Sequence, residues 1–153
     1  MTKLIAKAEG DRDVVVTRRF AAPPEKVWKA ITDTALMRQW MTSDFGALKS
    51  LTGEAVVGGQ HHFTWDNEGT DMNMIATYDL LEAPTLIRHR ESWPEYGYME
   101  NHIETRLIAV EDGTEMHMVI TFANAEARDQ TLAVGMTEGM EATYANLDKL
   151  LAG

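Results

Sequence analysis

The chain has 153 residues and a mass of 17.2 kDa, with 44% hydrophobic and 25% charged residues, which excludes a disordered or low-complexity protein. It carries 14 Lys and Arg against 24 Asp and Glu, and the resulting net charge of −10 argues against nucleic acid or an anionic membrane as the main partner. With no cysteine, the chain has no disulfides, thiolate metal ligands or cysteine nucleophiles.

The sequence indicates a single cytoplasmic domain. Residues 1–13 contain lysines but lack the apolar stretch that follows the charges of a signal peptide. No apolar run approaches the roughly 20 residues of a membrane span. Neither an internal repeat nor a linker rich in Pro, Gly and Ser divides the chain, so we expect one domain over residues 1–153.

The N-terminal part predicts one strand followed by two short helices. The β-branched run at 13–20 favours a strand. Pro23 and Pro24 end this strand, and because proline is well tolerated in a first helical turn, a short amphipathic helix follows. Asp33 is a good N-cap for a second helix that reaches Trp40.

From about residue 46 to 122 the pattern changes to short strands separated by turn residues. Asp112-Gly113 is the strongest hairpin signal, and a two-residue turn there pairs Glu111 with Thr114. One face of that hairpin is then small or apolar, which supports the register because a slip of one residue exchanges the two faces. The expected strands are Gln60–Asp66, Met72–Leu81, Leu86–Trp93, Asn101–Val110 and Thr114–Phe122.

A turn at residues 82–85 predicts a second hairpin. Its expected pairs are Leu81 with Leu86, Asp79 with Arg88 and Thr77 with Arg90. The outer face of this hairpin is therefore charged. The inner face is mostly apolar but carries His89 and Glu91, and a connection of odd length around residues 94–98, or a bulge, is needed to place Ile103 on the same face.

Three ionisable groups are candidates for the interior: His61, His89 and Glu91. Burial of an unpaired charge is costly, so they should be paired, hydrated or beside a cavity. The alternative is that they lie at the rim of the sheet in water. His89 and Glu91 are two residues apart on one face, about 7 Å by strand rise, which suits two contacts to one ligand better than a direct proton relay.

The last segment predicts one long helix. Asn124 is a good N-cap, and apolar residues at steps of three and four form one stripe to Leu151, with Gly135 and Gly139 on or beside it. A sheet with a single long helix buries its apolar face by curling around that helix. We therefore expect an α+β helix-grip fold, with a curved antiparallel sheet of about six to seven strands and two short helices after the first strand.

Motifs for other chemistries are absent. The sequence contains no Gly-rich dinucleotide or phosphate loop and no nucleophile elbow. His89, His102 and His117 fall on successive strands, but the expected registers do not bring them together. We therefore expect no metal and no cofactor.

The segment Arg19–Trp28, together with Trp40, Val57-Gly58-Gly59 and Gly139, resembles the activator-of-heat-shock-protein-ATPase-like family. This family belongs to the START-like, polyketide-cyclase-like (SRPBCC) superfamily, and the resemblance covers roughly residues 13–151. It implies a START-like helix-grip domain with a hydrophobic cavity between the long helix and the sheet, and neither a fixed cofactor nor shared catalytic residues.

Two positions depart from the family pattern. Members often have Gly-Trp in the last helix, where this chain has Gly139-Met140, and an aromatic residue after Gly-Gly, where it has His61. Both changes fall on the expected cavity wall, so the ligand of a relative cannot be transferred. In that family the chaperone-activating role belongs to members with an additional N-terminal domain, so we do not expect that role for this sequence of 153 residues.

We therefore expect a protein that binds a hydrophobic or amphipathic small molecule in an internal cavity. The alternatives left open are a cofactor-independent cyclase, dehydratase or hydrolase that uses His61 or His89 with Glu91, and a chaperone-regulating interaction module. A homodimer is also left open, and a chaperone partner is disfavoured. The expected ligand contacts are Trp40, His61, Phe63, Trp65, Met74, Tyr78, His89, Glu91, Trp93, Met118, Met136 and Met140.

Overall fold

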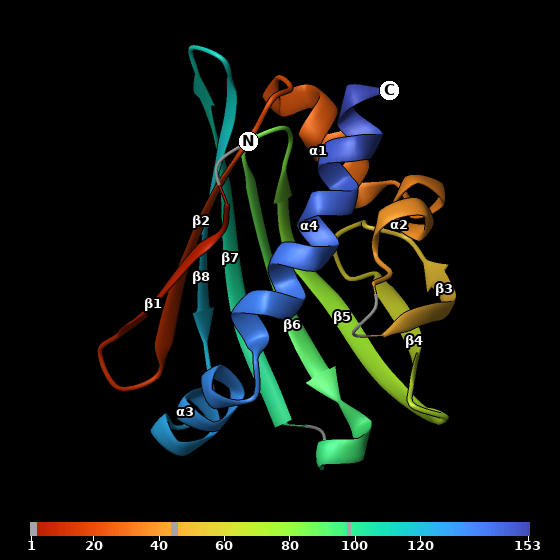
Figure 1. Ribbon diagram of the computed structural model, residues 1–153, viewed down its shortest axis with the longest axis vertical. Helices are drawn as coiled ribbons and strands as arrows, with labels where there is room; N and C mark the ends of the chain where they lie inside the picture. The colour runs from red at the N-terminus through yellow and green to blue at the C-terminus, as the bar shows by residue number, and fades with distance from the viewer. Residues whose placement is uncertain (1–2, 44–45, 98) are drawn as a thin grey trace.

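The computed structural model describes residues 3–43, 46–97 and 99–153. These residues form one curved antiparallel sheet of eight strands in the order β1-β2-β8-β7-β6-β5-β4-β3 (Figure 1). The strands are β1 Ile5–Glu9, β2 Asp13–Phe20, β3 Ala47–Gly53, β4 Gln60–Asn67, β5 Thr70–Glu82, β6 Leu86–Trp93, β7 Met99–Val110 and β8 Gly113–Thr121. The helices are α1 Pro24–Thr32, α2 Thr34–Trp40, η1 Pro94–Tyr96, α3 Ala125–Ala133 and α4 Met136–Ala152.

The helix-grip arrangement is confirmed. Helix α4 lies along the concave face of the sheet, α1 packs on α4 and on the ends of β7 and β8, and α2 packs between α4 and β3 (Figure 1). The strand count of six to seven was too low because β1 has no alternating pattern: it is a mostly exposed edge strand paired with β2. No helix in the described part of the chain is both long and apolar enough to cross a membrane.

The register of the β7–β8 hairpin differs from the prediction by two residues. Thr114 pairs with Ala109 rather than Glu111, and Gly113 is a strand residue paired with Val110. The reason is a close approach: a Cβ on Gly113 would lie 2.0 Å from the carbonyl oxygen of Phe20 on β2. The glycine is therefore needed inside the sheet and not in the turn, and because the shift is even, the two faces are as expected.

The β5–β6 hairpin is partly as predicted. Thr77 pairs with Arg90, but a bulge at Asp79 shifts the pairs nearer the turn, so Leu81 lies opposite Ile87 and not Leu86. Asp79 accordingly does not face Arg88, and its carboxylate instead forms an ion pair with Arg90 at 3.0 Å.

Around η1 the connection has the odd length that the sequence required. Trp93 pairs with Met99. His89 pairs with Ile103, which places Ile103 on the inner face. The inward-facing residues of β6 and β7 therefore lie on one continuous surface.

The expected single C-terminal helix is two helices. The Asn124 side chain caps α3 by accepting a hydrogen bond of 2.8 Å from the Ala127 amide, as predicted. Helix α3 ends at Ala133, and Gly135 then adopts φ +93°, a left-handed conformation that breaks the helix and begins α4. Only α4 therefore runs along the sheet.

Candidate functional site

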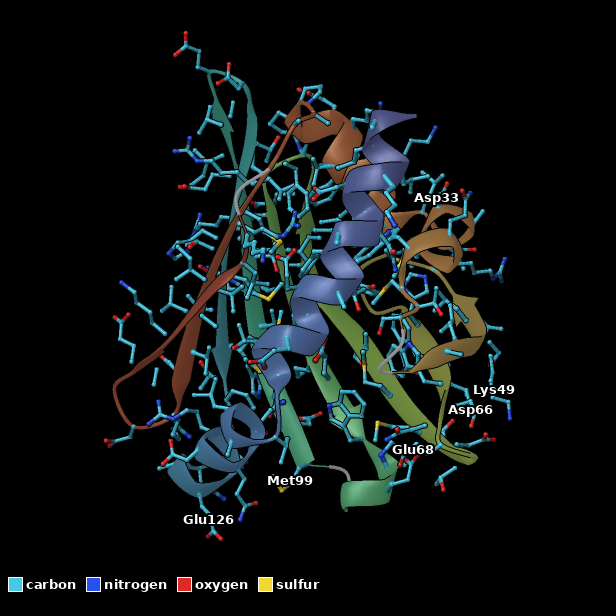
Figure 2. The ribbon with its side chains drawn as sticks, viewed as in Figure 1. Asp33, Lys49, Asp66, Glu68, Met99 and Glu126 are labelled. Atoms are coloured by element: carbon cyan, nitrogen blue, oxygen red, sulfur yellow. The ribbon has the colours of Figure 1, made fainter. Side chains whose placement is uncertain are left out.

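The space between α4 and the sheet has two parts. The closed half surrounds the C-terminal part of α4 and is packed: Phe20, Trp40, Tyr144 and Leu147 are buried, and Tyr144 contacts both aromatic rings. The open half lies toward the other end of the strands. In Figure 2 this end of the sheet is marked by the labels of Met99 on β7 and Glu68 at the β4–β5 turn, and it lies away from α1. Its inward-facing side chains are only partly buried and comprise Trp65, Met72, Trp93, Met136 and Met140.

A ladder of aromatic rings crosses the open half. Phe63 and Trp65 are two residues apart on β4, so both side chains face inward, and their rings stack with centroids 5.1 Å apart. Trp65 in turn stacks on Trp93 of β6 at 6.0 Å. The Trp65 indole donates a 3.0 Å hydrogen bond to the carbonyl of Met41, which fixes its orientation. The ladder therefore offers a flat apolar wall whose outer members are partly exposed.

Methionines form much of the remaining surface. Met74 is buried beside Phe63, whereas Met118 on β8 and Met136 and Met140 on α4 are partly exposed and pack against the core. Methionine is flexible and adapts to differently shaped neighbours. The predicted inward position of these residues is confirmed, while their contact with a ligand stays a prediction.

His89 and Glu91 form a direct pair on the inner face of β6. The His89 Nε2 atom lies 3.2 Å from the Glu91 Oε2 atom, so the two groups bond to each other despite their strand spacing. Their side chains are 14% and 26% exposed, which places them inside the grip and not in water at the rim. With Nε2–H donating to the carboxylate, Nδ1 is a bare acceptor, and it is buried with no partner among the described residues.

The side chain of His61 bonds to two other side chains, and its predicted contact with a ligand stays a prediction. It is fully buried, with Nε2 2.7 Å from the Thr34 hydroxyl and Nδ1 2.7 Å from the Tyr78 hydroxyl. Thr34 donates its own proton to the carbonyl of Gly53, so His61 donates from Nε2 and accepts from Tyr78. Both ring nitrogens are thus used, and burial lowers the pKa of His61, which keeps it neutral.

Tyr78 connects this network to the His89–Glu91 pair. Its ring lies 5.8 Å from the ring of His89, and its residue is 5% exposed. Burial, with a smaller contribution from the Glu91 carboxylate, raises the pKa of the Tyr78 hydroxyl. Tyr78 is therefore a fixed, neutral phenol that His61 orients beside the pair.

The predicted contact Trp40 lies in the closed half. It is 3% exposed, its indole donates to the carbonyl of Ala30 at 2.9 Å, and its ring stacks on Tyr144 at 5.5 Å. It therefore supports α4 rather than lining the open half.

The sequence analysis missed an ion-pair cluster between β2 and α4. Arg18 faces inward from β2, is 3% exposed, and forms ion pairs with Glu141 at 2.9 Å and Asp148 at 2.8 Å on α4. An alternation count along 13–20 places residue 18 on the same face as Val14 and Val16, and an arginine at that position was the available signal. The cluster fixes α4 to the sheet at its closed end.

Two depressions lie on the outer surface, away from the ladder. One of about 530 Å³ is lined by α2 and the β3–β4 loop, including Thr34, Arg38 and Glu54. A smaller one of about 300 Å³ lies beside β1 and includes Lys3 and Arg19. Neither includes a predicted ligand contact.

The family model for Activator of Hsp90 ATPase homolog 1-like proteins matches residues 21–152. The chain belongs to this family. A Rhodobacter sphaeroides protein of known structure is similar at 30% identity, with a TM-score of 0.90 and coverage of 98% of this chain and 99% of that one. No functionally curated protein matches the sequence.

More distant structures share the fold. A Staphylococcus epidermidis protein is 24% identical with a TM-score of 0.84, covering 95% of this chain and 92% of that one. Protein Ms6760 from Mycobacterium smegmatis is 18% identical with a TM-score of 0.86, covering 96% and 95%. The family and its START-like fold are consistent with binding of a hydrophobic ligand.

Proposed function

We propose that this family member binds one small amphipathic molecule in the open half, between α4 and the aromatic ladder. The observation that supports this most directly is the exposure of apolar side chains that face inward: Trp65, Trp93, Met136 and Met140 are all partly exposed. Apolar surface left accessible to water in a concave position costs free energy that a bound apolar molecule recovers.

The polar contacts come from one edge of this surface. His89 and Glu91 lie on β6 between the ladder and Tyr78, and a few polar groups in an otherwise apolar site are what orients a ligand. His61 supports Tyr78 from behind. Phe63 and Met74 form the buried base of the wall, and Met118 lies at its far side on β8.

The test is a titration with a neutral probe, 2-(1-naphthyl)ethanol, followed by two-dimensional NMR of the indole and methionine methyl groups. We expect saturable shifts at Trp65, Trp93 and Met140. Trp93→Leu should weaken binding about tenfold by removing one stacking face. Ile108→Ala, on the convex face, is the matched control and should leave the affinity unchanged. No saturable shift, or shifts confined to the depression at Thr34 and Arg38, would exclude this function.

A second candidate function is acid–base catalysis by His89, favoured by the contact with Glu91. The Glu91 carboxylate fixes the His89 ring by its bond to Nε2, and the Nδ1 atom is then free to accept a proton in a defined direction. This is the arrangement of an oriented general base. His89→Gln should then abolish product formation in mixtures of bound compounds while their binding persists. Unchanged compounds after prolonged incubation with the unsubstituted protein would exclude it.

A further inference from the structure

On the inward face, one carboxylate lacks a Lys or Arg partner among the described residues. Arg18 is a buried, inward-facing cation, and its guanidinium donates four hydrogen bonds to Glu141 and Asp148. Glu91 lies on the other side of the grip, and its partner is the His89 Nε2 atom. In the described ranges no Lys or Arg forms an ion pair with Glu91, so this carboxylate is partly buried without a cation.

The surroundings of Glu91 concentrate its negative potential. Its side chain is 26% exposed, and only one of its two oxygens, Oε2, has a hydrogen-bond partner among the described residues. Burial raises the pKa of both Tyr78 and Tyr144, and the Glu91 carboxylate contributes less in the same direction.

Ala76 and Asn101 lie opposite Glu91 on the neighbouring strands, and aromatic rings lie one position further along the inner face. Trp93 follows Glu91 on the same face of β6, and it stacks on Trp65. Tyr78 lies opposite His89 on β5. A cation over the faces of such rings is attracted by the ring quadrupole, and an anion is repelled by it.

We propose that the open half selects a ligand with a protonated amine on a flat apolar body, with the ammonium group at the free oxygen of Glu91 and the apolar body against Trp65 and Trp93. This inference rests on the proposed function and specifies the chemical class of its ligand. It also predicts rejection of fatty acids and other carboxylate-headed molecules, because such a head would meet Glu91 with no free cation to pair with.

The experiment compares three probes with one apolar body: 2-(1-naphthyl)ethylamine, 2-(1-naphthyl)ethanol and 1-naphthylacetate, titrated calorimetrically near pH 7. There the amine is protonated and the acid is ionised. We expect the amine to bind about tenfold more tightly than the alcohol, and the acetate about tenfold more weakly than the alcohol.

Glu91→Gln should reduce the ratio of amine affinity to alcohol affinity from about tenfold to less than about threefold, since the amide keeps the shape of the side chain and removes its charge. Glu100→Gln is the matched control: it removes the same charge from the convex face of the neighbouring strand, where Glu100 pairs with Arg90. This control should retain the full preference, and circular dichroism should show that both variants are folded.

The outcomes separate the two proposals. Binding of the alcohol with no gain for the amine, or a gain that persists in Glu91→Gln, would overturn the amine inference and leave the proposed function standing. Binding of none of the three probes would overturn both. The expected order with loss of the gain only in Glu91→Gln supports both.

Discussion

The closed and open halves of the grip are built from one helix and one sheet, yet the inward side chains are buried in the closed half and partly exposed in the open half. In the closed half, Arg18 bridges β2 to Glu141 and Asp148, and Leu147 is fully buried. In the open half, Met136 and Met140 near the N-terminal end of α4 are only partly buried, although they pack against the core. The comparison indicates that α4 is anchored through Glu141 and Asp148 and through the buried Leu147, so that the side chains of its first turns can be incompletely packed without loss of the fold.

The largest expected effect is at the anchor. Arg18→Met leaves two partly buried carboxylates without their cation, and we expect a loss of about 3–5 kcal/mol in the free energy of unfolding, measured by urea denaturation. Arg88→Met is the control, because the Arg88 side chain is 53% exposed and its pair with Glu104 should contribute less than about 1 kcal/mol. Equal losses in the two variants would contradict the view of Arg18 as the anchor.

The next prediction compares two positions on α4. Leu147→Ala creates a cavity in the closed half and should cost about 2–5 kcal/mol. Met140→Ala truncates a partly exposed side chain and should cost less than about 1 kcal/mol, while weakening binding of 2-(1-naphthyl)ethanol. Thermal and urea unfolding measure both. A similar cost at both positions would mean that the open half is a packed core and would remove the distinction between the halves.

Two glycines should respond with opposite signs. Gly135→Ala places a Cβ in a left-handed conformation at the start of α4 and should destabilise by about 1–2 kcal/mol. Gly139→Ala lies within the helix, and an added Cβ would meet no atom within 4 Å, so it should stabilise by about 1 kcal/mol. Stabilisation by both substitutions would show that α3 and α4 can merge into one helix, and the break at Gly135 would then not set the start of the open half.

The smallest expected effect is a pH dependence from His61. Its pKa is lowered from the ordinary 6.5 mainly by burial, so the folded state binds fewer protons than the unfolded state below that pH. The stabilising contribution is therefore complete above pH 6.5 and is lost as the pH falls.

Urea unfolding at about pH 7.5 and about pH 5.5 should show this loss, and His61→Gln should show a smaller one. The ion pair with Arg18 lowers the pKa of Glu141 below 4.5, so its contribution is lost only at more acidic pH and does not overlap. An identical pH dependence in both proteins would contradict the buried, neutral histidine.

Much of the fold follows from local patterns. Alternation along 60–66 places His61, Phe63 and Trp65 inward, and the structure confirms it. The Asn124 cap is likewise confirmed by its hydrogen bond to the Ala127 amide. Such features are predictable because the residues that decide them lie within a few positions of one another.

Other features of the fold could not be predicted from residues that are close together in the sequence. The β7–β8 register depends on the contact of Gly113 with Phe20 on another strand, and the Asp79 bulge changes the pairing near its turn. A strong local turn signal was therefore overruled at Asp112-Gly113, because a close approach between strands tolerates only glycine. The predicted turn at that site was wrong for this reason.

Local patterns were enough to predict the α+β helix-grip architecture, because hydrophobic alternation and caps are local properties, and short motifs indicated the family. Whether His89 and Glu91 face inward or lie in water at the rim was left open by the sequence. The tertiary structure alone decided which inward groups are already satisfied. His61 finds Thr34 and Tyr78, and Arg18 finds its two carboxylates, across separations of up to 130 residues. Glu91 finds His89 but no Lys or Arg among the described residues. Such partners depend on three-dimensional proximity that no local pattern encodes.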